Sequence, residues 1–199
     1  MRTVLPAVLC LVTLATSCRQ ANLIVNGDFE AGNTSFDSDY TYHVPGTMTL
    51  DGAARYGVGT SPRSYGNAAW ADFGDHTSGS GNMLIANGAT DDRAVWRVEG
   101  VPVMPGKHYR ISYSLAAFSA YPDGSTAAAS IIECCIDGQV VGTTVAPPVI
   151  AEWIEVSHDW NSGESTTVLI ELRDTKKAFV GNDFCIDDIV LASIDDDDG

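Results

Sequence analysis

The sequence predicts an all-β fold, an antiparallel β-sandwich of the jelly-roll type, and two features carry this prediction. Apolar and polar residues alternate with a period of two in many short stretches, and no long stretch shows helical periodicity. Turn-forming pairs such as Pro105-Gly106, Asp137-Gly138 and Ser162-Gly163 separate these stretches. In a chain of 199 residues, short strands with frequent turns are typical of one sandwich domain.

The alternation is clearest between Tyr109 and Leu115, where the odd-numbered residues are apolar and the even-numbered ones are Arg or Ser. This pattern predicts a strand with one face in the core and the other face outside it. The Asp137-Gly138 pair predicts a tight hairpin turn between two such strands. Strands are expected at 83–86, 94–98, 109–115, 131–136, 154–160 and 167–172. The side chains expected in the core are Phe29, Trp96, Tyr109, Tyr113, Phe184 and the imidazole of His158.

The segment from residue 31 to residue 81 differs from the rest of the chain. It is rich in Gly, Ser and Asp, which predicts long loops with short strands or none. It also contains seven Phe, Tyr and Trp side chains. Because loops carry binding residues more often than the scaffold does, this segment is the first candidate for a binding surface.

Acidic residues outnumber basic ones by 26 to 11, which gives a formal net charge of -15. This charge argues against nucleic acid and anionic membranes as partners. The apolar content of 45% is high enough for a packed core. The last residues, 193–199, form an acidic tail, and one domain is expected at 22–192.

The first 17 residues have the pattern of a signal peptide, because Arg2 precedes an apolar run from Val4 to Ala15 that is too short to span a bilayer. Two outcomes are open. Cleavage after Ser17 gives a secreted protein, or the residues before Cys18 act as a loose lipobox and Cys18 is lipidated. Residues 18–21 would then be a short tether. Either route places the protein outside the cell or on its surface, with membrane contact only through a lipid anchor.

Three cysteines lie within the expected domain, and an exported protein meets oxidising conditions. Strand alternation places Cys134 on the core face with Ile132, as a buried thiol, and Cys135 on the opposite face. A bridge between Cys135 and Cys185 is the favoured pairing if their strands are neighbours. The odd number leaves one thiol without a partner.

Acidic residues interrupt the apolar stretches at both ends of the domain. The stretches 22–30 and 181–191 are expected to be strands, with Asp28 and Glu30 on the first and Asp187 and Asp188 on the second. Buried carboxylates are costly unless they are paired, so two such strands side by side would gather oxygen ligands for a hard cation such as Ca²⁺. The alternative is that these carboxylates accept backbone N–H groups without a metal.

The same two stretches resemble a known family. Asn22-Leu23-Ile24-Val25-Asn26-Gly27-Asp28-Phe29-Glu30 is similar to the opening of bacterial carbohydrate-binding modules of the CenC type, and Asp183-Phe184-Cys185-Ile186-Asp187-Asp188-Ile189 is similar to their closing strand. The blocks 75–84, 103–109 and 160–163 also resemble this family, so the likeness runs from residue 22 to about residue 192. It implies a galactose-binding-like jelly roll. It also implies a structural Ca²⁺ held by Glu30 and Asp187 with backbone carbonyls, and with Asp28 and Asp188 beside them.

The resemblance makes a glycan or polysaccharide the expected partner. Sugar recognition uses flat aromatic rings with amides and carboxylates beside them, and the loop segment offers such side chains. The predicted ligand-binding residues are Tyr40, Tyr42, Tyr56, Tyr65, Asn67, Trp70 and Asp72, with Arg63 as a further polar partner. The alternative is that the rings fill the ends of the sandwich, because aromatic side chains bury well.

No catalytic residue is predicted. Asp75-His76-Thr77 is expected to hold a loop together, because neighbouring Asp and His residues in sequence do not make a triad. Asp91-Asp92 is expected in a solvated turn. The sequence therefore predicts a non-catalytic binding domain. The alternative is a structural or adhesive surface protein that uses the jelly roll for protein contacts, and a small hydrolase is a distant third.

Overall fold

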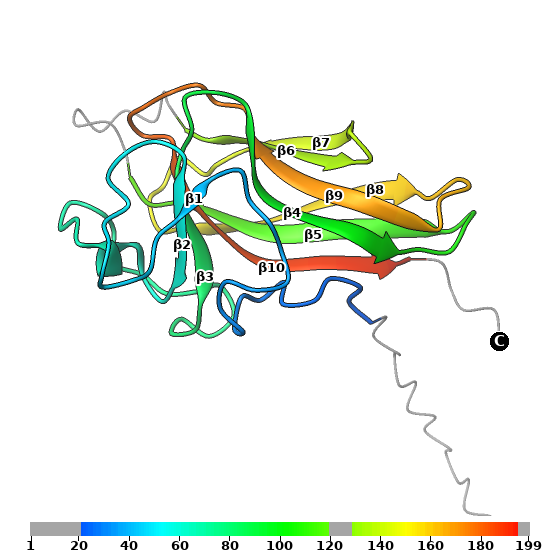
Figure 1. Ribbon diagram of the computed structural model, residues 1–199, viewed down its shortest axis with the longest axis horizontal. Helices are drawn as coiled ribbons and strands as arrows, with labels where there is room; N and C mark the ends of the chain where they lie inside the picture. Colours follow the sequence, from blue (N-terminus) through cyan, green and yellow to red (C-terminus); the bar gives the residue numbers. More distant parts are fainter. Residues whose placement is uncertain (1–20, 120–128, 195–199) are drawn as a thin grey trace, which may run out of the picture.

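The computed structural model describes residues 21–119 and 129–194, which form two β-sheets packed face to face (Figure 1). The elements are β1 (Thr41–Tyr42), β2 (Arg55–Gly59), the 3₁₀ helix η1 (Pro62–Tyr65), β3 (Met83–Asn87), β4 (Arg93–Pro102), β5 (His108–Ala117), β6 (Ile131–Ile136), β7 (Gln139–Val145), β8 (Trp153–Asn161), β9 (Thr167–Asp174) and β10 (Asp183–Ser193). One sheet has the order β1-β2-β3-β10-β5-β8, and the other has the order β4-β9-β6-β7. The predicted all-β jelly-roll sandwich is confirmed.

The strands predicted between residues 83 and 191 are all present, and all pairs of the named strands are antiparallel except β1 with β2. The hairpin between β6 and β7 is also confirmed. Its turn residues Asp137 and Gly138 have φ angles of 50° and 76°, as the tight hairpin turn requires. Within the described residues, no helix is long and apolar enough to cross a membrane.

The main core lies between the sheets and holds the five predicted aromatic residues. Phe29, Trp96, Tyr109, Tyr113 and Phe184 are each at most 3% exposed. His158, on β8, is only half-buried. Gly142 lies against its ring, and in this structure Nε2 has no hydrogen-bond partner.

The N-terminal stretch lies beside β10, as predicted, but it is not a strand. The Leu23 N–H donates to the Leu191 carbonyl at 2.9 Å, and the Ile189 N–H donates to the Gly27 carbonyl at 2.8 Å. Between these contacts the chain turns, because Asn26 and Phe29 have φ angles of 58° and 56°. The stretch therefore borders β10 through separate contacts rather than a continuous ladder.

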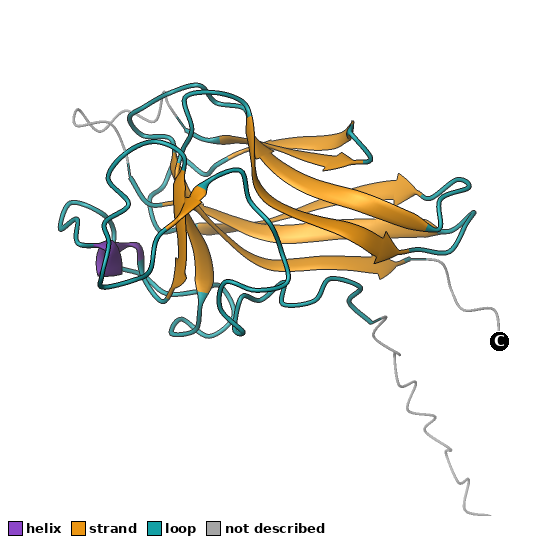
Figure 2. Ribbon diagram, viewed as in Figure 1, coloured by secondary structure: helices purple, strands orange, loops and turns teal. Residues whose placement is uncertain are grey.

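Loops cover one half of the outer face of the six-stranded sheet and leave the other half open. The covered half is the end with β2 and β3, where the loops gather in Figure 2. A second apolar cluster lies beneath them, formed by Leu50, Tyr65, Trp70, Met83, Ile85, Phe118 and Cys185. The open half consists of β5, β8 and the second part of β10.

The predicted bridge between Cys135 and Cys185 is wrong. Cys134, Cys135 and Cys185 are buried free thiols. Cys185 belongs to the cluster on the outer face of the six-stranded sheet, whereas Cys134 points into the main core. Cys135 therefore faces outward from the four-stranded sheet, and the whole sandwich separates it from Cys185.

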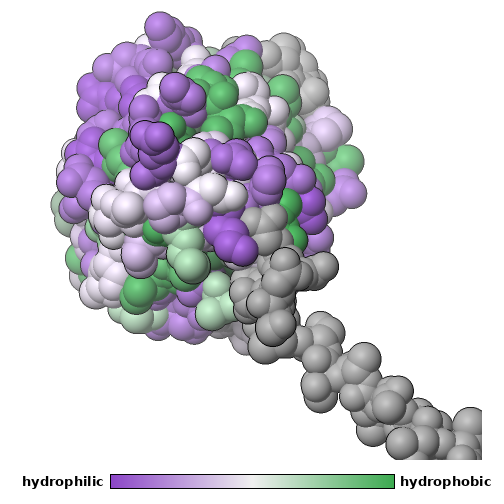
Figure 3. Space-filling model, turned by 90° about the vertical axis from the view of Figure 1, so that its right-hand side faces the viewer, coloured by the Kyte–Doolittle hydropathy of each residue, from purple (hydrophilic) through white to green (hydrophobic). Residues whose placement is uncertain are grey.

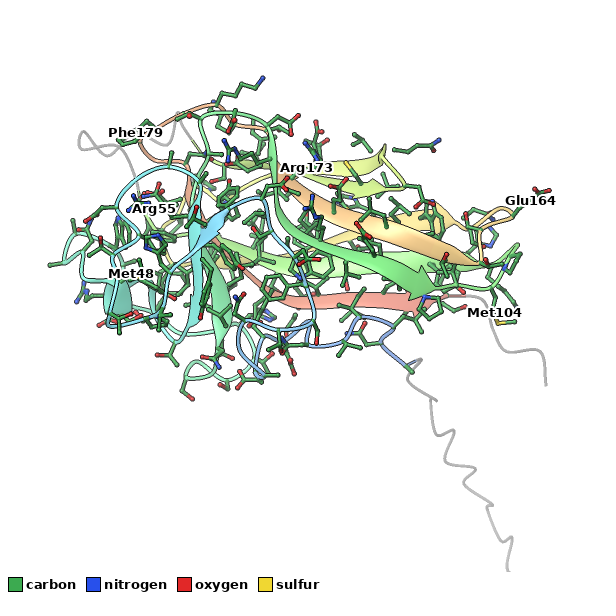
Figure 4. All side chains as sticks on the ribbon, in the orientation of Figure 1. Met48, Arg55, Met104, Glu164, Arg173 and Phe179 are labelled. Atoms are coloured by element: carbon green, nitrogen blue, oxygen red, sulfur yellow. The ribbon has the colours of Figure 1, made fainter. Side chains whose placement is uncertain are left out.

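Residues 1–20 and 195–199 lie outside the described residues. They include the predicted signal peptide, the Cys18 lipidation site and most of the acidic tail. Figure 3 shows the end of the sandwich that lies on the right in Figure 1, and its hydrophobic residues lie in small groups between hydrophilic ones. Met104 and Glu164 lie at this end, on the β4–β5 and β8–β9 turns (Figure 4).

Candidate functional site

Small polar side chains line the open half of the six-stranded sheet. Ser112 on β5 lies opposite Ser157 on β8, and Ser114 lies opposite Glu155. On the other side of β5, Ser112 lies opposite Val190 of β10. Because the central side chains are short, the face is hollowed into an open groove of about 660 Å³. Its volume is within the range of small-molecule sites, but its lining is polar.

One wall of the groove comes from the loop that precedes β3. His76 and Thr77 line the groove, and both bind the carboxylate of Asp188. His76 Nδ1 lies 2.7 Å from Asp188 Oδ2, and the Thr77 hydroxyl donates to the same carboxylate at 2.7 Å. The expected role of His76 and Thr77 in holding this loop is thus confirmed.

A bulge in β10 directs Asp188 towards this loop. The pairing of β10 with β5 shifts register between Asp187 and Val190, and Asp188 has a φ angle of 51°. A bulge places two residues where a regular strand has one and re-aims a side chain. The side chains of two consecutive acids can therefore both lie on the outer side of the sheet, Asp187 buried and Asp188 partly exposed at the groove.

An ion pair closes the other end of the groove. The Arg110 guanidinium donates to both carboxylate oxygens of Asp159, at 2.7 and 2.9 Å. This pair raises the pKa of Arg110 and lowers the pKa of Asp159, mainly through the hydrogen bond between them. Glu155 lies between the two ends with 85% of its side chain exposed, and its carboxylate is 4.0 Å from His76 Nε2.

Trp153 is the aromatic side chain beside the groove. On β8, Trp153 pairs with Ala116 of β5, and the next pair on the same face of the sheet is Ser114 with Glu155. This is the end of the groove where His76 lies. The Trp153 ring packs edge-on against His76 and Phe73, with centroids 5.8 Å away in each case, and its indole N–H donates to the Gly74 carbonyl. Trp153 is half-buried, so part of the ring remains accessible.

An acidic corner adjoins the groove, and its carboxylates hold the loop at 75–82. Asp187 accepts the His76 N–H at 2.9 Å, and Glu30 accepts the Asn82 N–H at 2.7 Å. Asp75 accepts the N–H groups of Ser78 and Gly81. Asp187 and Glu30 thus each accept a backbone N–H group, which is the contact that the alternative to a metal site expects.

Burial and mutual repulsion act on the acids of this corner. Burial, together with the neighbouring charges of Asp188 and Asp75, raises the pKa of Asp187 to about 7 against the N–H groups that it accepts. Burial also acts to raise the pKa of Asp75, but the hydrogen bonds from Ser78 and Gly81 outweigh it, so that pKa is lowered.

The predicted metal ligands surround this corner without forming a complete coordination shell. Within the described residues, no group of three or more His, Cys, Asp or Glu side chains is arranged to hold a metal ion. Asp28, Glu30, Asp75 and Asp188 line a cavity of about 300 Å³, and Asp187 lies buried beside it. The carboxylates at this cavity offer oxygen atoms, the kind of ligand that Ca²⁺ takes.

The structure separates the predicted sugar-binding residues from the groove. Tyr40, Tyr56, Tyr65 and Trp70 are at most 6% exposed, so their faces cannot stack on a sugar ring. The prediction that these four residues bind sugar is therefore wrong. The alternative, in which their rings fill the sandwich, holds for them. Tyr42 is half-buried and packs against Tyr56.

The predicted polar partners lie in the covering loops. Asp72 is exposed and binds Ser61 and Arg63, and Asn67 accepts the Ala69 N–H within its own turn. Asp91, in the turn before β4, is exposed as expected and pairs with Arg93. None of the predicted sugar-binding residues lines the groove. Sequence reasoning missed Ser112, Ser114, Glu155 and Ser157 as site residues, although their alternation with apolar residues was visible.

Comparison with known proteins supports the fold. No protein-family model matches the sequence, and no curated protein matches it. A Stig cyclase, Fisc from Fischerella sp. TAU, aligns with a TM-score of 0.55 at 13% identity, over 85% of this chain and 95% of the cyclase. An arabinose-bound GH51 α-L-arabinofuranosidase aligns with a TM-score of 0.56 at 13% identity, over 87% of this chain. This chain spans only 26% of that enzyme.

A weaker likeness, with a TM-score of 0.45 at 10% identity, is found to the xylan-binding CBM22-1 domain of Xyn10C from Paenibacillus barcinonensis, over 74% of this chain and 92% of that domain. At 13% identity, the two likenesses with TM-scores above 0.5 show the fold alone. Jelly-roll sandwiches serve several functions, so the function has to be argued from the groove.

Proposed function

We propose that this protein is a non-catalytic carbohydrate-binding domain whose ligand lies in the groove over β5, β8 and β10. The observation that carries the proposal is the open groove of about 660 Å³ with hydroxyl, carboxylate and guanidinium groups along its length. A sugar hydroxyl both donates and accepts hydrogen bonds, as Ser and Thr do, so this lining can match a row of them. Trp153 offers a partly accessible ring at one end for stacking.

The shape of the groove favours a chain-like ligand over a compact one. It is open to solvent, and its floor runs along rows of paired residues from Ser114 and Glu155 to Arg110 and Asp159. Adjacent strands lie about 4.8 Å apart and paired residues on one face repeat about every 6.8 Å along a strand. An extended oligosaccharide can thus contact successive rows, whereas a small apolar molecule would leave these polar groups unpaired.

Two matched substitutions test the location of the site. Ser157 is exposed on β8 in the groove, and Thr143 is exposed on β7 at the edge of the other sheet. Ser157→Trp should fill the groove and abolish binding to whichever oligosaccharide a glycan array identifies. Thr143→Trp should leave that binding unchanged. Equal binding by both variants would contradict the site, and failure of the wild type on every glycan would favour the adhesive alternative.

We also propose that the acidic corner binds Ca²⁺ as a structural ion, with Glu30 and Asp187 as side-chain ligands and Asp28, Asp75 and Asp188 beside them. The support is the all-oxygen donor set, with carboxylates crowded into a partly buried corner where burial and mutual repulsion raise the pKa of Asp187. A ligand that binds only the folded state stabilises it by about 2.7 kcal/mol at one hundred times its Kd. Millimolar Ca²⁺ should therefore raise the melting temperature over that in EDTA, and Glu30→Gln should reduce this difference. An identical melting temperature in both buffers would contradict the site.

Membership of the CenC-type family, export and lipidation at Cys18 are part of the same proposal. The first rests on the opening and closing motifs, and the others rest on the apolar leader. Mass spectrometry of the N-terminus of the protein from an exporting bacterial host distinguishes a lipidated Cys18 from a free N-terminal cysteine. Detection of the intact leader would contradict export.

A further inference from the structure

The basic side chains of the groove already have carboxylate partners within the protein. Arg110 is held by both oxygens of Asp159, and His76 is held by Asp188. A two-point Arg–carboxylate contact satisfies the planar guanidinium in a fixed geometry. A carboxylate on a bound sugar would have to displace Asp159 to reach Arg110, so the groove has no cation ready for an acidic ligand.

One carboxylate of the groove is available, by contrast. Glu155 has 85% of its side chain exposed, and in the described part of the chain the only basic side chain within ion-pair distance of it is His76, at 4.0 Å. Glu155 lies on β8, the edge strand of the sheet, opposite Ser114 of β5. There it can accept hydrogen bonds from a ligand in the groove.

The net charge of the protein also disfavours acidic ligands and favours cationic ones. The formal net charge of -15 creates a field that repels polyanions and attracts cations towards a groove of the same sign. Acidic glycans therefore meet repulsion at long range and no accessible cation at contact. The negative charge of the protein attracts glycans with protonated amino groups at long range, and Glu155 can pair with such an amino group in the groove.

We infer that the groove selects glycans that carry amino groups, of the glucosamine type, over glycans that carry uronic acids, and that Glu155 and the Arg110–Asp159 pair determine this preference. The inference rests on the proposed carbohydrate-binding function and specifies its ligand class. A single exposed charge pair changes an affinity by up to about fivefold, and screening by salt reduces the effect.

The test uses three β-1,4-linked oligosaccharides of equal length: a glucosamine oligomer, its N-acetylated form and a glucuronic acid oligomer. Titration calorimetry at low salt and about pH 6 keeps the amines largely protonated, so the charge difference is expressed. The wild type should bind the glucosamine oligomer about fivefold more tightly than the N-acetylated form, and the glucuronic acid oligomer most weakly. Added salt should reduce the differences.

Three variants separate the contributions. Glu155→Gln should remove most of the preference for the amino form, while Glu164→Gln, at an exposed carboxylate on the β8–β9 turn, should retain it. Asp159→Asn frees Arg110 and should strengthen binding of the uronic acid oligomer. Equal wild-type affinity for all three oligomers, or a uronic acid preference, would overturn the inference while the carbohydrate-binding function stands. If no oligosaccharide binds, the proposed function itself fails.

Discussion

Asp183 is a buried carboxyl group whose ionisation should destabilise the fold. It begins β10, is 6% exposed and accepts hydrogen bonds from the Ser119 hydroxyl and the Gly88 N–H. Burial raises its pKa from 3.8 to about 6, and the nearby charge of Asp174 contributes to this rise against the two hydrogen bonds. Asp183→Asn replaces it with a neutral group of nearly the same shape.

The sign and the size of the effect follow from the pKa shift. Because the pKa is higher in the folded state than in the unfolded state, the stability that this group contributes is present below about pH 4 and is lost as the pH rises through about 6. A shift of about two units corresponds to roughly 3 kcal/mol of unfolding free energy. The variant does not ionise, so its stability relative to the wild type should increase by about that amount between pH 4 and pH 7.5.

Urea unfolding of both proteins in EDTA at about pH 4.5, 6 and 7.5 measures this difference as a free energy at each pH. Asp159→Asn is a control of opposite sign, because the bond from Arg110 holds the pKa of Asp159 below its ordinary value. That variant should gain no stability at pH 7.5. A difference between wild type and Asp183→Asn that is the same at every pH would refute the reasoning.

Three further predictions concern the links that hold the fold together. Asn22→Ala removes the side chain that donates to the Ile189 carbonyl and accepts the N–H groups of Ile24 and Leu191. This variant should lower the unfolding free energy, measured by urea titration, by about 1–3 kcal/mol. No change would show that the terminal contact is dispensable. Gly27→Ala places a Cβ 2.0 Å from the Ile189 carbonyl oxygen and should cost about 1–3 kcal/mol, more than Gly59→Ala, whose nearest contact is a side-chain atom 3.2 Å away. A reducing agent should leave the melting temperature unchanged, because all three described cysteines are free thiols, and a drop would reveal a disulfide.

The strands could be predicted from the sequence because their pattern is local. An alternation of period two depends on one buried face, and the strands at 109–115, 154–160 and 167–172 show it clearly. The stretch at 22–30 has a strand-like composition, but its contacts with β10 are set by tertiary structure. The close approach of Gly27 to Ile189 and the left-handed backbone at Asn26 are not encoded by alternation.

The site could not be predicted in the same way. Aromatic residues in a Gly- and Ser-rich segment indicate a binding loop only if the loop stays open, and here Tyr65 and Trp70 pack beneath it. The acids at the two ends of the domain were recognised correctly as neighbours, yet their bonds to the loop at 75–82 depend on a segment that no sequence spacing connects to them. The free thiols follow from Cys135 and Cys185 lying in different sheets, which is a property of topology.

The sequence nevertheless distinguishes the covered half of the six-stranded sheet from the open half. β3 and the start of β10 are continuous apolar runs, Met83–Ala86 and Phe184–Ile186, which is the pattern of strands buried on both faces. β5, in the same sheet, alternates instead, with Ser112 and Ser114 on the face that lines the groove. A change from continuous to alternating apolar residues within one sheet thus marks where its covering loops end. In this protein that boundary coincides with the β10 bulge, where the buried Asp187 holds the loop and Asp188 faces the groove.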